Sequence, residues 1–379
     1  MSSNTIFFAG GGTGGHVYPM LAVAAALQQL RPSTRIVFVG TSRGMETEMV
    51  PDAGFDLELL DVRPLRGGGV SGALRGVARA AMAISESRAL LRHYRPSVVF
   101  SIGGYAAGPV SLAARTLGIP VALMEPNSVV GLANRLSAPF VQRAYTNYSA
   151  AEAQFSSAGV RRTGVAIRDG FECRSYEGPG GTISVLVLGG SQGALSLNQT
   201  LPEAFADAVT PLRVVHQTGE AHVDEVRERY RKLGGAQTVD VVPFIRDMPA
   251  HIGAADLVIS RAGASAVAEI CGIGRASMLL PYPFAAGDHQ RLNALALEAT
   301  GGCVCIPAER CSRDEIRTTI DELCSDPTRL REMATAAAVL GKPNAAHEVA
   351  ADLIGLAGWD KLSTPGRGAG GRSLEQEAC

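Results

Sequence analysis

"FFAGGGTGGHVYPM", residues 7–20, carries the strongest structural signal in this sequence. A short apolar run leads into five glycines and one threonine at positions 10–15, and His16 follows directly. Glycines at this density let the backbone turn sharply and approach a ligand closely. Free N–H groups at the start of the following helix favour anions or polar oxygens. The stretch therefore predicts a strand, a ligand-binding turn and a helix.

Three of these glycines also satisfy the G-x-G-x-x-G pattern of a dinucleotide-binding turn. That fold requires an acidic residue about 20 positions further on, at the end of the second strand. The second strand here, RIVFVG at 35–40, ends without a carboxylate, and Glu46 and Glu48 lie past its turn. A nicotinamide or flavin cofactor is therefore not expected. The alternative stays open that these glycines only form a tight strand-to-helix turn and bind no ligand.

Apolar runs alternate with longer amphipathic stretches along almost the whole chain. Strand runs without polar alternation, separated by helices, are typical of a parallel sheet covered on both faces. The predicted strands are 5–10, 35–40, 97–104, 121–127, 182–190, 212–219, 238–244, 256–263 and 276–283.

The pattern occurs twice. "VLVLGGSQGA" repeats the strand, glycine turn and helix start of "FFAGGGTGGH" about 180 residues later. A chain of 379 residues is also too long for one core. We therefore predict two doubly wound α/β domains, residues 1–163 and 164–340, that face each other across a cleft. A helix at 341–358 should cross back to the first domain, and the polar, Gly-rich residues 359–379 should form a disordered tail.

Composition excludes several classes of function. The formal net charge of −1 gives no basic footprint, so nucleic acid is not an expected partner. Seven cysteines without C-x-x-C spacing do not predict a structural zinc site. The longest uncharged stretch, 96–114, is interrupted by proline and glycine and does not resemble a membrane span.

A specific resemblance rests on motifs that occur in a fixed order. They are "GGTGGHVYP" (11–19), "SIGGYAAGP" (101–109), "EPNSVVGLANR" (125–135), "LGGSQGALSLNQ" (188–199), "SRAGASAVAEI" (260–270) and "DHQRLNA" (288–294). Together they resemble the MurG family of GT-B glycosyltransferases, over residues 5 to about 358. The resemblance implies transfer of N-acetylglucosamine from UDP-GlcNAc to the undecaprenyl-linked muramyl-pentapeptide precursor of peptidoglycan. Another UDP-sugar GT-B transferase, acting on a lipid or natural product, and a non-catalytic nucleotide-binding protein are the alternatives.

The resemblance implies that the second domain binds the donor. Ser191 would open a helix whose backbone donors stabilise the leaving UDP, or serve only as its N-cap. Glu269 would accept both ribose hydroxyls, or lie on a solvated helix face. The expected donor contacts are Arg168, Ser191, Ile245, Ala264, Ser265, Ala266, Val267, Ala268, Glu269 and Gln290.

The same resemblance gives the first domain the acceptor and the catalytic base. His16 is the candidate base, because it is the titratable side chain of the first glycine turn. It could instead bind a ligand oxygen or hold the turn, and Glu125 is the reserve candidate. The resemblance also implies that Thr13, Gly14 and Gly15 line the cleft and that Asn127 lies near the donor sugar. The chain departs from the family at Met124 and Pro126, where a histidine and a glutamine are common.

The lipid acceptor also implies a membrane surface. Residues 62–95 are rich in arginine and hold one acid, Glu86. Arg63, Arg66, Arg75 and Arg79 fall beside apolar residues, as in a patch that binds an anionic leaflet. An ordinary solvated helix face is the alternative. The expected location is the cytoplasmic side of the inner membrane, as a peripheral protein. No D-x-D occurs, so neither a metal bridging the diphosphate nor a cofactor is expected.

Overall fold

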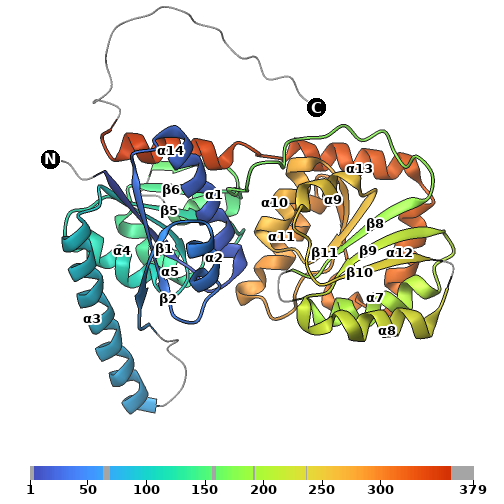
Figure 1. The fold of residues 1–379 in the computed structure, drawn as a ribbon, viewed down its shortest axis with the longest axis horizontal. Helices are drawn as coiled ribbons and strands as arrows, with labels where there is room; N and C mark the ends of the chain where they lie inside the picture. The colour runs from blue at the N-terminus through green and yellow to red at the C-terminus, as the bar shows by residue number, and fades with distance from the viewer. Residues whose placement is uncertain (1–3, 63–68, 156–158, 191–192, 236, 360–379) are drawn as a thin grey trace, which may run out of the picture. The chain divides into compact units, whose positions relative to one another are not determined.

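The computed structural model of the protein describes residues 4–62, 69–155, 159–190, 193–235 and 237–359, with side chains omitted for 69–78. The described chain forms two compact units (Figure 1). Unit 1 contains the residues up to Arg168 and those from Asn344 onward, and unit 2 is Asp169–Pro343.

Unit 1 is built on a seven-stranded parallel sheet with the strand order β3-β2-β1-β4-β5-β6-β7. Its helices and strands are β1 (Thr5–Gly10), α1 (Gly14–Leu30), β2 (Arg35–Thr41), α2 (Glu46–Asp52), β3 (Asp56–Leu60), α3 (Gly69–Tyr94), β4 (Val98–Gly103), α4 (Ala107–Thr116), β5 (Val121–Glu125), α5 (Leu132–Ser137), β6 (Arg143–Thr146), α6 (Ser149–Glu152), β7 (Gly159–Arg161) and α14 (Ala345–Leu356).

Both faces of this sheet are covered, and the sequence of β1 shows why. All six of its residues are buried, and successive side chains point to opposite faces. Ile6 and Phe8 pack into the core beneath α1 and α14, whereas Phe7 and Ala9 pack into the core beneath α4. A strand that lies between two helical layers therefore needs apolar residues at every position.

The last described residues of the chain belong to unit 1. Helix α14 packs against α1, and Trp359 just beyond it is 1% exposed. The Arg31 guanidinium lies 4.8 Å from the centre of the Trp359 ring. Trp359 was expected to begin a disordered tail, and this is wrong at that residue because its indole ring fills the core. Residues 360–379 lie outside the described residues.

Unit 2 is built on a six-stranded parallel sheet with the order β10-β9-β8-β11-β12-β13. Its helices and strands are β8 (Ile183–Leu188), α7 (Leu195–Ala206), β9 (Leu212–Gln217), α8 (Val223–Leu233), β10 (Thr238–Val242), α9 (Met248–Ala254), β11 (Leu257–Ser260), α10 (Ala264–Ile273), β12 (Ala276–Leu279), α11 (His289–Glu298), β13 (Cys303–Cys305), α12 (Arg313–Cys324) and α13 (Pro327–Val339).

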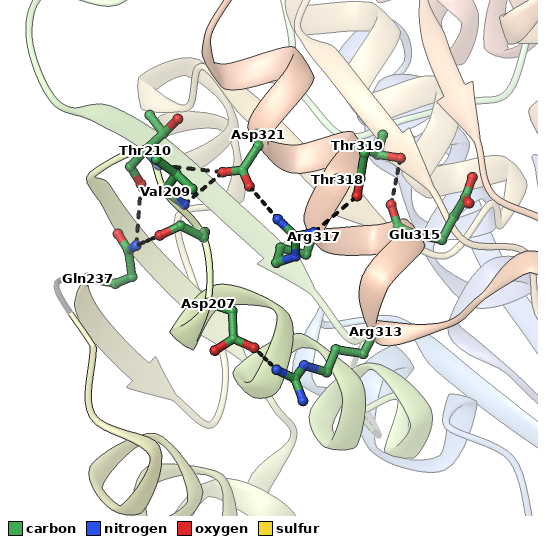
Figure 2. A network of polar contacts seen from close by, with 11 residues as sticks. Asp207, Val209, Thr210, Gln237, Arg313, Glu315, Arg317, Thr318, Thr319 and Asp321 are labelled. Carbon is green, nitrogen blue, oxygen red and sulfur yellow. Dashed lines mark hydrogen bonds and ion pairs between the residues drawn. The ribbon is translucent and has the colours of Figure 1, made fainter.

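A polar network closes the amino ends of β9 and β10 (Figure 2). The Asp321 carboxylate on α12 accepts from the Val209 N–H at 2.9 Å and from Arg317 at 3.2 Å. The Gln237 side chain accepts from the Leu212 N–H at 2.6 Å and donates to backbone carbonyls of the same loop. The network lies at the opposite strand ends from the glycine turns, so its contribution is to stability.

The two parallel α/β units confirm the predicted fold class. All nine predicted strands are present, with ends shifted by up to four residues. The unit boundaries fall after Arg168 and Pro343, rather than after residues 163 and 340. The first shift has a clear cause, because the Gly164 N–H bonds to Thr146 O at 3.1 Å and Ala166 lies in the core of unit 1.

Candidate active site

In both units the strand order reverses where a glycine turn begins. The reversal lies between β1 and β4 in unit 1 and between β8 and β11 in unit 2. Ligands of open α/β sheets bind beyond the carboxyl ends of the strands at such points. In unit 1 the two turns touch, because a Cβ atom on Gly104 would lie 2.6 Å from Gly11 O. Each unit therefore has its own candidate ligand-binding turn.

The turn after β1 presents free backbone donors. Thr13 is the N-cap of α1, with its C=O accepting from the His16 and Val17 N–H groups, and its side chain makes no capping bond. The N–H groups of Gly14 and Gly15 have no hydrogen-bond partner within the described residues. Thr13 and Gly15 are exposed. These three predicted residues thus form an open helix N-terminus.

His16 is oriented by the turn that it follows. Its Nδ1 lies 3.0 Å from Gly11 O, and because a carbonyl only accepts, Nδ1 must donate. The neutral imidazole is then protonated on Nδ1 and its Nε2 carries the lone pair. A Cβ atom on Gly103 would lie 3.8 Å from that Nε2. The bare backbone of Gly103 therefore leaves room for a ligand beside the basic nitrogen.

Glu125, at the end of β5, is 2% exposed and fully engaged. One carboxylate oxygen accepts from the Asn127 N–H at 3.1 Å and from the Asn127 amide at 3.3 Å. The other accepts from the Gly131 N–H and the Asn134 amide, both at 2.9 Å. Four donors match the acceptor capacity of a carboxylate. Glu125 thus organises the loop that carries Asn127, and this geometry argues against its use as a base.

The departures from the family pattern concern buried positions. Met124 is fully buried in the core of unit 1, and its carbonyl accepts from Asn134 at 3.0 Å. Pro126 is buried as well. Asn134 Oδ1 is buried and has no hydrogen-bond partner among the described residues. This oxygen lies 3.6 Å from the position that a Cβ atom on Gly103 would take. His16 Nε2 lies 3.8 Å from the same position, so both groups border the space beside Gly103.

Arg168 is the last residue of unit 1 and was expected in the donor-binding domain. Its guanidinium lies 4.9 Å from the centre of the Tyr18 ring on α1. Tyr18 in turn contacts the glycine turn, because a Cβ on Gly14 would lie 3.1 Å from its ring. Arg168 is thus held beside the turn of unit 1, at the junction of the units along the chain.

In unit 2 the turn after β11 leads into α10. Gly263 is its N-cap and provides no side-chain cap. The N–H groups of Ala264, Ser265 and Ala266 have no acceptor within the described part of unit 2. Ser265 Oγ is buried and likewise lacks a hydrogen-bond partner there. A helix N-terminus with an adjacent unsatisfied hydroxyl is suited to bind an anion.

The rest of the predicted α10 segment divides by burial. Ala264 and Val267 are buried, whereas Ser265, Ala266, Ala268 and Glu269 are half-buried. Glu269 lies in the second turn of the helix, one turn beyond Ser265. Ala264 and Val267 could thus meet a ligand only through their backbone, and the contacts expected at Ser265, Ala266, Ala268 and Glu269 stay predictions.

A buried polar group supports the first turn of unit 2. A Cβ on Gly193 would lie 2.0 Å from Thr218 O, so only glycine fits. The same carbonyl accepts from the Asn198 amide at 3.0 Å, and His216 bonds to Asn198 and to Tyr230. Burial lowers the pKa of His216 to about 3, so it stays neutral. Ser191, the predicted diphosphate contact, lies outside the described residues.

Ile245 and Gln290 complete the predicted donor contacts. Ile245 is 4% exposed, and its backbone N–H and C=O make no hydrogen bond to other described residues. Gln290 Oε1 accepts from the Tyr282 N–H at 2.9 Å, which leaves its NH₂ group for a ligand. Asn293, on the same helix, is fully buried and donates to Ala262 O at 3.2 Å. Asn293 therefore supports the turn before α10.

Arg261, in that same turn, was not singled out from the sequence. It donates to Leu280 O at 2.8 Å and to Ser196 Oγ at the start of α7. Burial lowers the pKa of this guanidinium from its ordinary value. It joins the two turns of unit 2. No group of three His, Cys, Asp or Glu side chains suited to a metal occurs among the described residues.

Comparisons with known proteins match both units. The family model "Glycosyltransferase family 28 N-terminal domain" matches residues 6–146, and "Glycosyltransferase family 28 C-terminal domain" matches residues 184–349. The fold and these two domains define the class: a GT-B glycosyltransferase of family 28.

Individual relatives narrow this class. A protein of Sorangium cellulosum (strain So ce56) is 48% identical over 358 residues, covering 93% of this chain and 88% of the relative. It is a UDP-N-acetylglucosamine–N-acetylmuramyl-(pentapeptide) pyrophosphoryl-undecaprenol N-acetylglucosamine transferase, as is a 40% identical protein of Syntrophus aciditrophicus (strain SB) that aligns over 91% of this chain and 96% of its own. The crystal structure of Acinetobacter baumannii MurG superimposes with a TM-score of 0.76 at 30% identity, over 93% of this chain and 99% of that one. The chain belongs to this MurG family of N-acetylglucosaminyltransferases.

Proposed function

We propose that this enzyme transfers N-acetylglucosamine from UDP-GlcNAc, bound by unit 2, to the lipid-linked muramyl-pentapeptide, bound by unit 1, in peptidoglycan synthesis. The acceptor's 4-hydroxyl oxygen forms a bond to the anomeric carbon with inversion. The bond from that carbon to the diphosphate breaks, and its electron pair leaves with UDP. The hydroxyl proton passes to His16 Nε2.

The unsatisfied Ser265 hydroxyl at the N-terminus of α10 is the observation that best supports donor binding in unit 2. A buried polar atom without a partner is costly unless a ligand completes it. Three free backbone N–H groups lie at the same helix end. Together they offer charge stabilisation to the diphosphate as it becomes the leaving group. The half-buried Glu269 then takes the ribose hydroxyls, and the free backbone groups of Ile245 take the uracil.

His16 is assigned the base role on its geometry. Its Nδ1 is used by the turn, so Nε2 is the atom that accepts a proton. Glu125 is excluded from that role in this proposal because four donors already occupy its carboxylate. In this proposal Thr13, Gly14 and Gly15 of the same turn line the substrate site, and Asn127, in the loop after β5, contacts the donor sugar.

The lipid acceptor leads to a second part of the proposal, peripheral binding to the cytoplasmic face of the membrane. Helix α4 of unit 1 packs against α3 and α5, and all three helices carry exposed apolar side chains. They are Met82, Leu112, Leu132 and Leu136. Arg79, Arg115 and Arg135 on the same helices are exposed too. The side chains of Arg63, Arg66 and Arg75 lie outside the described ones. Among the described helices, none is long and apolar enough to span a bilayer.

Label transfer tests the proposed reaction. UDP-GlcNAc radiolabelled in the sugar should give label in a butanol-extractable lipid when the muramyl-pentapeptide lipid is present. A His16→Ala variant should lose activity by about 10²- to 10⁴-fold, because general base catalysis contributes that much. The same variant should still bind UDP, since the expected donor contacts other than Arg168 lie in unit 2.

Other outcomes distinguish the alternatives. Label transferred equally well to diacylglycerol, and not to the muramyl lipid, indicates a different lipid glycosyltransferase. UDP binding without any transfer indicates a non-catalytic nucleotide-binding protein. A fully active His16→Ala variant overturns the assignment of the base while leaving the reaction intact.

A further inference from the structure

The peptide group that joins Gly11 to Gly12 is held on both sides. Its C=O accepts from His16 Nδ1 at 3.0 Å. Its N–H donates to Glu46 Oε2 at 2.7 Å. A trans peptide points these two groups in opposite directions, so one rigid plane connects the Glu46 carboxylate to the imidazole.

Glu46 occupies a site built for its carboxylate. It is 1% exposed, at the start of α2. Its other oxygen accepts from the Thr41 N–H at 2.9 Å and from Thr41 Oγ1 at 3.0 Å. Its side chain also fills the space beside three glycines. A Cβ atom would lie 2.4 Å from Glu46 atoms at Gly11, 2.5 Å at Gly40 and 1.9 Å at Gly44.

We infer that Glu46 is a positioning residue for His16, acting through the Gly11–Gly12 peptide. This rests on the proposed role of His16 as the base. A charged acceptor on the N–H side polarises the peptide and strengthens its carbonyl as a hydrogen-bond acceptor. The carbonyl then holds His16 with the proton on Nδ1 and the lone pair on Nε2. As Nε2 takes up the acceptor's proton, the same carbonyl stabilises the positive charge on the ring.

Two other charged groups are connected to this assembly. Glu125 is linked to the space beside His16 through Asn134, whose amide donates to its carboxylate at 2.9 Å. The Arg168 guanidinium lies over the ring of Tyr18, a residue of α1 that follows the glycine turn. Neither contacts Glu46, so a change at Glu46 leaves both in place.

Glu46→Gln tests the inference, because glutamine keeps the size and removes the charge. One of its donor hydrogens must then face the Gly12 N–H or the Thr41 N–H. We expect kcat to fall about 10- to 100-fold, the usual effect of removing an orienting partner of a functional histidine. The KM for UDP-GlcNAc should stay within about twofold, since the donor binds unit 2. Glu48→Gln, an exposed position on the same helix, is the matched control and should behave as the wild type.

The pH profile of kcat separates positioning from simple structural support. Losing the negative charge disfavours protonated His16, so the acidic limb should move to lower pH. A variant that merely loosens the fold would lose activity at every pH without moving that limb. Glu46→Asp, which keeps the charge, should retain the wild-type limb.

The outcomes of the two proposals are distinct. An inactive wild type, or an active His16→Ala, contradicts the proposed function or its base. An inactive His16→Ala together with a Glu46→Gln of wild-type kcat and pH profile contradicts the inference alone. In the double variant, Glu46→Gln should add less than about twofold to the loss caused by His16→Ala. If Glu46→Gln does not fold, ¹⁵N NMR of the wild-type enzyme decides: neutral His16 protonated on Nε2 overturns the inference, and protonation on Nδ1 supports it.

Discussion

Some residues of this molecule hold the glycine turns in place from beneath. Others carry hydrogen-bonding groups that no described protein group uses. Glu46 and His216 were not candidates from the sequence, yet each is buried beneath one turn. Ser265 and the Ile245 backbone, by contrast, retain unused hydrogen-bonding groups within the described residues. The residues with unused groups are the ones that we expect ligands to satisfy.

Glu269→Ala should raise the dissociation constant of UDP by about 100-fold or more. The variant loses two charge-assisted hydrogen bonds to the ribose, each worth roughly 1.5 kcal/mol or more. Isothermal titration calorimetry with UDP and with 2′-deoxy-UDP measures this directly. The wild type should prefer UDP and the variant should not. Glu322→Ala, at an exposed position of α12, serves as the control, and equal affinities in all three proteins would refute the ribose contact.

His216 should make unit 2 less stable in mild acid. Burial lowers its pKa to about 3 from 6.5, so between these values the unfolded chain binds one more proton than the native one. The stabilisation is therefore complete above pH 6.5 and is lost as pH falls, at about 1.4 kcal/mol per pH unit.

Denaturant unfolding at pH 6.5, 5.75 and 5.0 measures this slope. His216→Gln should be less stable at pH 7 but should show a flatter dependence. His251→Gln removes an exposed histidine and should keep the wild-type slope. If His216→Gln loses stability with acid as steeply as the wild type, another group carries the effect.

At the scale of elements, α14 shows how a terminal helix is anchored. The Asp352 carboxylate lies 2.7 Å from Arg143 Nε and 2.9 Å from Arg161 Nη2. It also accepts from the Tyr145 hydroxyl at 2.9 Å, and burial raises the pKa of that tyrosine. Strands β6 and β7 thereby bind α14 through a single acid.

Asp352→Ala should destabilise unit 1 by about 3 kcal/mol, because it leaves a partly buried arginine without its carboxylate. Thermal unfolding followed by circular dichroism checks this. Glu348→Ala, one turn earlier and exposed, should stay within about 0.5 kcal/mol of the wild type. Equal stability of the two variants would mean that the cluster does not anchor the helix.

Elements with strong local signals were predictable from the sequence. The continuous apolar runs of β1, β4 and β8 identify them as buried parallel strands. Strands β3 and β7 escaped prediction because they are the two edge strands of the sheet and their burial is partial. Strand β6 is short, and its Tyr145 is buried only because α14 returns from far along the chain.

At the scale of the whole molecule, the sequence predicted the general position of the candidate site but not the contacts that hold its residues. The two glycine turns and His16 were evident because glycine clusters have a local backbone signature. The role of Glu46 was not, because five residues separate it from Thr41 and 34 from Gly12. Glu125 showed the converse, since its saturation by four donors depends on the course of a loop.

The proposed membrane binding is tested on the whole enzyme. Replacing Arg79 and Arg92, both exposed on α3, by glutamine should weaken binding to vesicles containing 30% phosphatidylglycerol. Each arginine contributes about 1 kcal/mol near an anionic surface, so the pair should lower the partition coefficient about 30-fold. Co-sedimentation measures this. Arg246→Gln with Arg329→Gln in unit 2 is the control, and an unchanged partition of the α3 variant would contradict the proposed surface.

The central claim is that unit 2 binds the donor diphosphate on backbone amides at its glycine turns. A crystal structure of the enzyme with UDP-GlcNAc tests it most directly. We expect the uracil at the Ile245 backbone, the ribose at Glu269 and the diphosphate at the N-terminus of α10 beside Ser265. A diphosphate bound instead at Gly14 and Gly15 of unit 1, with α10 unoccupied, would contradict the account.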